Sequence, residues 1–273
     1  MAPSIDRYLL QRNHVASARL NFQNYVWKDA LGYNIHPDLP VRNEQDYKIA
    51  DVGAGTGIWL IDVNRQFPLV HLDGFDISVD QFPAKEWLPD NITLRTLDVF
   101  APISEDLKGK YDLVHVRLFL AVVQNYDPTP ILRNLMDMLK PGGYLQWDEY
   151  DLSTMELMTS KPGISTNMMR NVMEHFRFKL DFGWVSTLPT SFQKQGLDCI
   201  SNYLYSPSNY IQIMLTQIHL MVAEEVSFVK MDNSDPETGG PARRREIQKA
   251  SQEAKDGAIW HFSLQVTVGH KRE

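Results

Sequence analysis

A segment with three alternating glycines, Gly53, Gly55 and Gly57, limits the fold of this chain more than any other stretch. Residues 47–52 before it are mostly apolar and predict a short buried strand, and residues 58–67 after it predict a helix. Glycine has no Cβ, so the backbone N–H groups of such a turn and the start of the next helix can approach a ligand closely. The segment therefore predicts a strand–turn–helix unit with a ligand at the turn, and a tight turn that binds nothing is the alternative.

The spacing of these glycines differs from that of dinucleotide-binding proteins. Their pattern is Gly-x-Gly-x-x-Gly, whereas this chain has Ile58 directly after its third glycine. Asp51 precedes the first glycine by two residues and adds a carboxylate at the end of the strand. An NAD(P)-dependent dehydrogenase has a similar sheet, so it stays open as an alternative that the spacing disfavours.

The pattern Asp-x-Gly-x-Gly-x-Gly at residues 51–57 resembles the first motif of class I S-adenosylmethionine-dependent methyltransferases. The resemblance implies that the chain uses S-adenosylmethionine and releases S-adenosylhomocysteine, and we expect no metal. It also implies that the turn packs against the methionine part of the cofactor and that Asp51 helps to hold its amino group. The residues assigned to this part of the cofactor are Asp51, Gly53, Ala54, Gly55, Thr56 and Gly57.

A second carboxylate lies where the family's second motif is expected. Residues 70–75 predict a strand that ends at Asp76, 19 residues after Gly57. In a βαβ unit the C-terminal end of the next strand is level with the turn, so a carboxylate there can accept hydrogen bonds from both ribose hydroxyls. The resemblance assigns Asp76 and its neighbour Ile77 to the cofactor, and the alternative is a loop carboxylate.

Two further strand ends carry polar residues. Residues 92–97 predict a strand that ends at Asp98 and Val99, and the resemblance implies that these two residues bracket the adenine. In the family the carboxylate takes the exocyclic amine, and the apolar residue contacts the ring face. Residues 111–116 predict a fourth strand with Arg117 at its end. This arginine is assigned to the cofactor side of the cleft, although contact with the substrate or pairing with a carboxylate stays open.

The alternation of strands and helices predicts the fold class. We expect an α/β, Rossmann-like, seven-stranded and mostly parallel sheet with helices on both faces. Residues 129–139 predict a helix, and the sequence Leu-Lys-Pro-Gly-Gly-Tyr-Leu at 139–145 is a frequent family landmark before the fifth strand at 144–147. Residues 259–268 alternate, and the family pairs this last strand antiparallel between the fifth strand and the strand predicted at 196–205. Ligands of such sheets bind beyond the carboxyl ends of the strands.

The predicted organisation is a single domain with additions around the sheet. We expect an N-terminal helical lid at 1–36, helical over 5–31, and a methyltransferase domain at 37–273. Inserted substrate-side helices are expected at about 152–195 and 207–230. A plain packing role for the N-terminal helix is the alternative to a lid.

The N-terminal segment narrows the resemblance. The residues Arg-Leu-Asn-x-Gln-x-x-Val-Trp at 19–27, followed by Gly-Tyr and His-Pro within 32–37, resemble a fungal secondary-metabolite branch of the family. That branch includes enzymes that act on diketopiperazine-type natural products. The resemblance implies N- or S-methylation of a peptide-derived metabolite, with O-methylation next. A protein of this fold that binds the cofactor without methyl transfer, as a regulator, cyclase or isomerase, is the alternative.

Composition and charge narrow the class of protein further. The chain has 273 residues, 43% hydrophobic and 22% charged, as is typical of a soluble globular protein. Its net charge of −7 argues against nucleic acid as the main partner, and its single cysteine, Cys199, excludes an internal disulfide. The apolar run at 113–123 is too short to span a bilayer, and the first residues lack the apolar core of a signal peptide. We therefore expect a cytoplasmic enzyme with a small-molecule substrate and no membrane partner, of unspecified oligomeric state.

Methionine is concentrated in the C-terminal half. Eight of the eleven methionines lie within 152–231, which as a set favours a pocket for an apolar acceptor, although each one alone is consistent with an ordinary core position. The candidate substrate contacts are Tyr25, Trp27, Trp147, Met173 and Met214.

The chemistry of methyl transfer requires little of the protein beyond alignment. The acceptor atom displaces an activated leaving group in line, and a thiolate or neutral amine needs no base, whereas a phenol or amide does. Asp148 and Glu149 follow the fifth strand and are candidates for orienting or deprotonating the acceptor, with exposed loop carboxylates as an equal alternative. No histidine stands out as catalytic, since structural roles are open to His14, His36, His115, His175 and His219.

Overall fold

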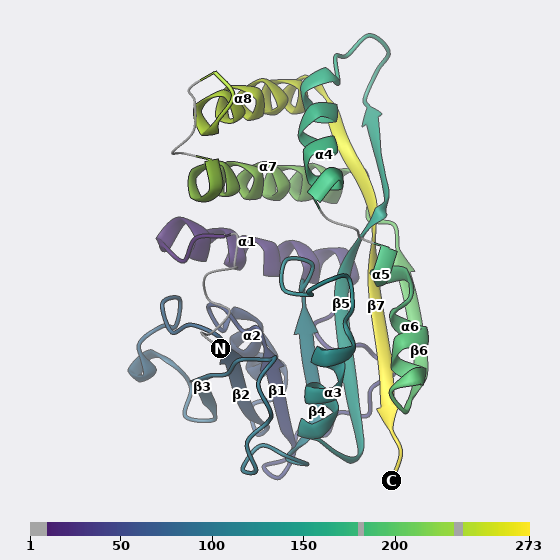
Figure 1. Ribbon diagram of the computed structural model, residues 1–273. Coiled ribbons are helices and arrows are strands. Elements are labelled where there is room, and N and C mark those ends of the chain that lie inside the picture. Colours follow the sequence, from purple (N-terminus) through teal and green to yellow (C-terminus); the bar gives the residue numbers. More distant parts are fainter. Residues whose placement is uncertain (1–9, 180–182, 232–236) are drawn as a thin grey trace.

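The computed structural model describes residues 10–179, 183–231 and 237–273, and its centre is a seven-stranded sheet with the order β3-β2-β1-β4-β5-β7-β6 (Figure 1). The first five strands pair in parallel, and β7 runs antiparallel between β5 and β6. The predicted α/β class with a mostly parallel sheet is confirmed, and so is the antiparallel last strand. The strands are β1 (Lys48–Val52), β2 (His71–Asp76), β3 (Ile92–Thr96), β4 (Tyr111–Arg117), β5 (Leu139–Thr159), β6 (Leu197–Tyr205) and β7 (Ala258–Lys271).

Helices cover both faces of this sheet, as predicted. Neighbouring strand residues point to opposite faces, and accordingly Ile49 and Leu113 belong to one hydrophobic core while Ala50 and Val114 belong to the other. Apolar residues of α1, α2, α4, α7 and α8 complete the first core, and those of α3, α5 and α6 complete the second. The helices are α1 (His14–Leu31), α2 (Ile58–Gln66), η2 (Lys85–Trp87), α3 (Thr129–Met138), α4 (Asn167–Lys179), α5 (Gly183–Ser186), α6 (Leu188–Lys194), α7 (Asn209–Met231) and α8 (Gly240–Asp256).

The fifth strand is much longer than predicted, and the expectation of helix over residues 152–159 is wrong. The strand continues to Thr159, where Met158 pairs with Ile259 of the equally long β7. Figure 1 shows this extension of β5 and β7 beside α4. Met155 and Leu157 pack against the first core while the residue between them is exposed, so the segment alternates as a strand with one buried face does.

Helix α1 begins later than predicted and packs into the first core. Residues 10–13 are not helical, and the Asn13 side chain caps the helix by accepting the backbone N–H groups of Val15 and Ala16. The start predicted at residue 5 falls among residues outside the described part. Val26 and Trp27 are buried in the first core, so α1 is held like any other core helix.

The helices predicted at 129–139 and at about 207–230 are confirmed as α3 and α7. Helix α7 lies beside α1 and packs against β7 at the carboxyl side of the sheet (Figure 1). Across the three described ranges, none of the helices is long and apolar enough to cross a membrane.

Candidate functional site

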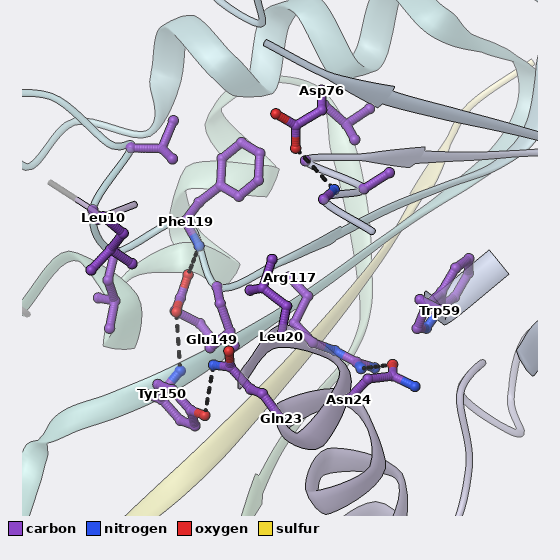
Figure 2. A pocket seen from close by; sticks show the side chains of 18 of the residues that line it. Leu10, Leu20, Gln23, Asn24, Trp59, Asp76, Arg117, Phe119, Glu149 and Tyr150 are labelled. Carbon is purple, nitrogen blue, oxygen red and sulfur yellow. Dashed lines mark hydrogen bonds between the residues drawn. The ribbon is translucent and has the colours of Figure 1, made fainter. Parts of the chain in front are cut away.

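A cavity of about 470 Å³ lies at the carboxyl ends of the parallel strands, where the strand order reverses between β1 and β4. Its strand side is formed by the glycine turn, Asp76 and Asp98. Its helix side is formed by residues of β5, α4 and α7, of which Tyr150, Met173 and His219 are the ones that matter below. One face of α1 closes the space between the two sides (Figure 2).

The glycine turn is fitted tightly between two neighbours. Gly53 has a φ of +79°, and a Cβ there would overlap the ring of Phe119, so a larger residue meets both strain and a steric clash. Gly55 has a φ of +53°, and a Cβ there would lie 3.0 Å from Leu20 of α1. Gly57 is the N-cap of α2 and has a left-handed conformation. It does not line the cavity, so its position does not support the prediction that it contacts the cofactor directly.

The carboxylate of Asp76 is anchored to this turn. The backbone N–H of Gly55 donates to Asp76 Oδ2 at 2.9 Å (Figure 2). The backbone N–H of Ser78 donates to Oδ1 at 3.2 Å. Burial raises the pKa of Asp76 despite these two donors. Each oxygen keeps a further lone pair, so the carboxylate can accept hydrogen bonds from a ligand in the cavity.

The other predicted strand-end residues line the same cavity. Ile77, Asp98 and Val99 join Asp76 there, although they follow two different strands. Asp98 Oδ1 accepts the backbone N–H of Phe100 at 2.9 Å, which fixes its side chain at the end of β3. The structure thus brings together two carboxylates and two apolar side chains that the sequence placed 22 residues apart, at 76 and 98.

A buried chain of charges ties β1, β4 and β5 together beneath the cavity. His115 Nδ1 lies 2.7 Å from Asp51 Oδ1, and its Nε2 lies 3.3 Å from Asp148 Oδ2. Arg117 donates to the same Asp148 oxygen through Nη2 at 2.8 Å. Burial lowers the pKa of His115, but the bonds to Asp148 and Asp51 outweigh it and raise the pKa overall. Both ring nitrogens face carboxylate oxygens, an arrangement that favours the doubly protonated imidazole. The Trp59 ring stacks on the imidazole with 3.9 Å between ring centres.

This network decides two sequence predictions. Arg117 pairs with Asp148 and also lines the cavity, so the pairing with a carboxylate is confirmed and its contact with cofactor or substrate stays a prediction. Asp148 is fully buried and does not line the cavity. Burial raises its pKa, but Arg117 and His115 more than offset this and lower it. The interpretation of Asp148 as a group in contact with the acceptor is therefore corrected: it holds Arg117 and His115.

Glu149 is a buried residue of the cavity and not an exposed loop carboxylate. Its Oε2 accepts the backbone N–H of Phe119 at 2.7 Å, and its Oε1 accepts that of Tyr150 at 3.2 Å (Figure 2). Burial raises the pKa of Glu149 to about 8, because the ionised form is poorly solvated there. At neutral pH this side chain is mostly protonated.

Four of the five predicted substrate contacts do not line the cavity formed by the described residues. The cavity face of α1 is formed by residues 19, 20, 23 and 24, so the helical period turns Tyr25 to solvent and Trp27 into the core. Trp147 lies in the second core, and Met214 packs against the first. Met173 of α4 does line the cavity.

Sequence reasoning missed most of the helix side. Gln23 of α1 donates to the Tyr150 hydroxyl at 3.0 Å, and Arg19 forms a buried ion pair with Glu225 of α7 at 2.7 Å. His219, on the same helix as Glu225, also lines this side. These residues come from segments up to 206 positions apart, and no local pattern links them.

Comparison with known proteins gives a consistent result. Residues 50–145 match the family described as methyltransferase domain. The methyltransferase grgD of a Penicillium species is 38% identical over 165 residues, 55% of this chain and 54% of the relative. The N-methyltransferase tcpN of Claviceps purpurea is 32% identical over 152 residues, with the same two shares. The chain thus spans about half the length of the curated relatives it matches.

A solved structure resembles the whole chain in fold. It is phosphoethanolamine N-methyltransferase 2 of Haemonchus contortus in complex with phosphomonomethylethanolamine and S-adenosylhomocysteine. The TM-score is 0.56 at 13% identity, over 98% of this chain and 60% of that one. At this identity the likeness concerns the fold alone.

Proposed function

We propose that the chain is an S-adenosylmethionine-dependent methyltransferase that methylates a small, largely apolar natural product. Support comes from the methyltransferase family match at residues 50–145 and from the similarity to the fungal methyltransferases grgD and tcpN. A nitrogen or sulfur of a peptide-derived metabolite is the first choice of acceptor, with oxygen next. The name of the relative tcpN, an N-methyltransferase, supports nitrogen. A cytoplasmic location and the absence of a metal remain parts of this proposal.

The strand side of the cavity fits S-adenosylmethionine in its chemistry. Asp76 offers free lone pairs to two ribose hydroxyls, and Asp98 offers an acceptor to an exocyclic amine beside the apolar Val99. Gly53 and Gly55 line the cavity and have no side chain to cover their backbone, so a ligand can approach the turn closely. When bound, the cofactor supplies an activated methyl group. The residues proposed to hold it are Asp51, Gly53, Ala54, Gly55, Thr56, Asp76, Ile77, Asp98, Val99 and Arg117.

The helix side is the proposed acceptor site. Leu152, Met155 and Met173 give it apolar surface. Helix α1 covers the cavity between the two sides, and Thr56 of the glycine turn donates to Asn21 of this helix at 2.6 Å. We propose that α1 keeps water from the reacting atoms, which holds the acceptor desolvated and aligned.

One observation carries the proposal: Asp76 is fixed by the turn N–H of Gly55 and faces the same cavity as the helix side. The test is calorimetric titration of S-adenosylmethionine and S-adenosylhomocysteine into the purified protein. Asp76→Ala is expected to weaken both by about 1–3 kcal/mol, the loss from a buried polar contact. Asp80→Ala, an exposed carboxylate four residues on, should bind like the wild type. No binding of either compound to the wild type would end the proposal.

The alternative of cofactor binding without transfer needs a second measurement. Incubation with isotopically labelled methyl donor and a panel of natural-product acceptors, followed by mass spectrometry, separates the two. A labelled product supports methyl transfer. Tight cofactor binding with no product from any acceptor supports a regulator, cyclase or isomerase of the same fold.

A further inference from the structure

The tautomer of His219 is fixed by its own helix. Its Nδ1 lies 2.8 Å from the carbonyl oxygen of Leu215, one turn earlier in α7. A carbonyl oxygen only accepts, so Nδ1 carries the proton and Nε2 keeps a lone pair. Nowhere in the described ranges does a protein group form a hydrogen bond with this Nε2.

The lone pair of His219 Nε2 is on a side chain that lines the cavity. His219 lines the helix side and is 8% exposed. In the described part of the chain, the indole nitrogens of Trp59 and Trp260 are fully buried and have no hydrogen-bond partner. His219 Nε2 is not one of these fully buried, unpartnered atoms. The imidazole packs between aromatic rings, with Tyr150 and Phe262 each at 5.0 Å between ring centres. Nε2 is therefore the polar atom that this imidazole offers to a ligand.

The surroundings keep the imidazole neutral. Burial lowers the pKa of His219 to about 4, and the positive charge of Arg19 acts in the same direction. The other titratable groups facing this side are Glu149 and Tyr150 of β5, both neutral at pH 7, and Glu225, which is paired with Arg19. Both carboxyl oxygens of Glu149 already accept backbone N–H groups, whereas His219 Nε2 has no hydrogen-bond partner among the described residues. His219 is therefore the group proposed to accept a proton here.

We propose that His219 is a catalytic residue that takes up, through Nε2, the proton which the acceptor atom loses as it is methylated. This inference rests on the proposed function. It narrows the acceptor to one whose reacting atom carries a proton and is only weakly basic, namely an amide-type N–H or a phenolic or enolic O–H.

The step balances without any further reactant. The lone pair of the acceptor atom forms the bond to the methyl carbon, the carbon–sulfur bond breaks, and its electron pair stays on sulfur. The acceptor's proton moves to His219 Nε2 and leaves later to solvent. Methylation makes an amide nitrogen or a phenol oxygen strongly acidic, so a weak base suffices. An amine gives an alkylammonium with a pKa near that of lysine, about 10, which keeps its proton beside such a base.

The first experiment measures the tautomer directly. Imidazole nitrogen chemical shifts of ¹⁵N-labelled protein at pH 7 should show a protonated Nδ1 and an unprotonated Nε2 for His219, with titration well below pH 6. An Nε2–H tautomer or an imidazolium at pH 7 would overturn the inference, whether or not the acceptor is known.

The second experiment measures transfer. The probes are a cyclic dipeptide with free amide N–H groups and a simple phenol, both at pH 7, and an alkyl thiol at pH 9, where more of it is thiolate. His219→Gln should bind S-adenosylhomocysteine like the wild type but lose about 10²–10⁴-fold in kcat with the first two probes. Any turnover of the thiol, which reacts as a thiolate, should fall much less. His270→Gln, at the far end of β7 with its ring 4.8 Å from Tyr144, is the matched control and should behave as the wild type.

The outcomes separate the inference from the function it rests on. Equal kcat for wild type and His219→Gln with the amide or phenol probe overturns the role of His219 and leaves methyl transfer standing. Equal losses with all three probes also overturn it, because a structural defect would act on each. A wild type that binds no cofactor and methylates no probe overturns the proposed function, and the inference falls with it. If the wild type binds cofactor but methylates none of the probes, the nitrogen chemical shifts of His219 decide: an unprotonated Nε2 at pH 7 supports the inference, and a protonated one overturns it.

Discussion

The two sides of the cavity handle charge in opposite ways. On the strand side, buried groups that can carry opposite charges lie in contact: His115 lies between Asp51 and Asp148, and Arg117 pairs with Asp148. On the helix side, burial shifts three groups towards their neutral forms. It raises the pKa of Glu149 to about 8 and that of Tyr150 to about 12, and it lowers that of His219 to about 4.

The difference teaches what each side is suited to hold. Paired charges in a rigid framework orient a polar, charged ligand, since the partners keep each ion in place. Neutral polar atoms among apolar side chains suit a neutral acceptor, because a charged one would lose its hydration without a partner. On the helix side, Arg19 donates to both carboxylate oxygens of Glu225, and this ion pair holds α1 against α7.

The largest expected effect concerns Glu149. Its pKa is raised from 4.5 to about 8 in the folded protein, so the folded state holds this proton more tightly than the unfolded state. The stability that this gives is complete below about pH 4.5 and is lost as the pH rises to about 8, by about 5 kcal/mol at most. Urea denaturation between pH 5 and 8.5 should show this slope in the wild type and a much smaller one in Glu149→Gln.

The exposed Glu105 provides the control for that comparison, because Glu105→Gln removes a carboxylate at the surface and should leave the slope unchanged. Parallel stability curves for the wild type and Glu149→Gln would mean that the helix side does not neutralise its carboxyl group.

The next effect concerns the support of α1. Arg19→Met leaves Glu225 buried without its partner and should lower the free energy of unfolding by about 3–5 kcal/mol. The double variant Arg19→Met/Glu225→Leu removes both charges and should recover most of that loss. Thermal and chemical denaturation measure both variants. A single variant that loses less than about 1 kcal/mol would contradict a dry, closed helix side.

The smallest effect sharpens the division between the two sides. Met173 lines the helix side, so Met173→Ala should weaken the binding of an apolar acceptor by roughly 1–2 kcal/mol of lost apolar contact. This loss corresponds to a KM about tenfold higher. Its affinity for S-adenosylhomocysteine should stay that of the wild type. Met158→Ala, on the partly exposed extension of β5, is the control. A matching loss of cofactor affinity in Met173→Ala would show that the two sides are not separate.

The strand side could be predicted from the sequence because its information is local. The glycines, Asp76 and Asp98 each end a recognisable strand, and parallel strands bring their carboxyl ends to one edge. The helix side is assembled from α1, β5, α4 and α7, whose contacts span most of the chain. The sequence predicts substrate contacts at Tyr25 and Trp27, but the helical period of α1 turns the polar Gln23 and Asn24 to the cavity instead.

Two other differences between the sequence-based predictions and the structure have physical causes. The segment 152–159 has a weak alternation that becomes a strand because the long β7 lies beside it. Nothing in the sequence around His219 distinguishes it from an ordinary helical histidine. Its distinction is that Leu215 fixes its tautomer and a cavity faces its other nitrogen, and both facts require coordinates.

The most direct test of the account is a crystal structure of the protein with S-adenosylhomocysteine. We predict that the ribose hydroxyls lie within hydrogen-bonding distance of Asp76, that the adenine lies beside Asp98 and Val99, and that the sulfur faces the helix side with Glu149 and His219. Electron density for the ligand outside this cavity, or with its adenine among α4 and α7, would contradict the division of the cavity into a cofactor side and an acceptor side.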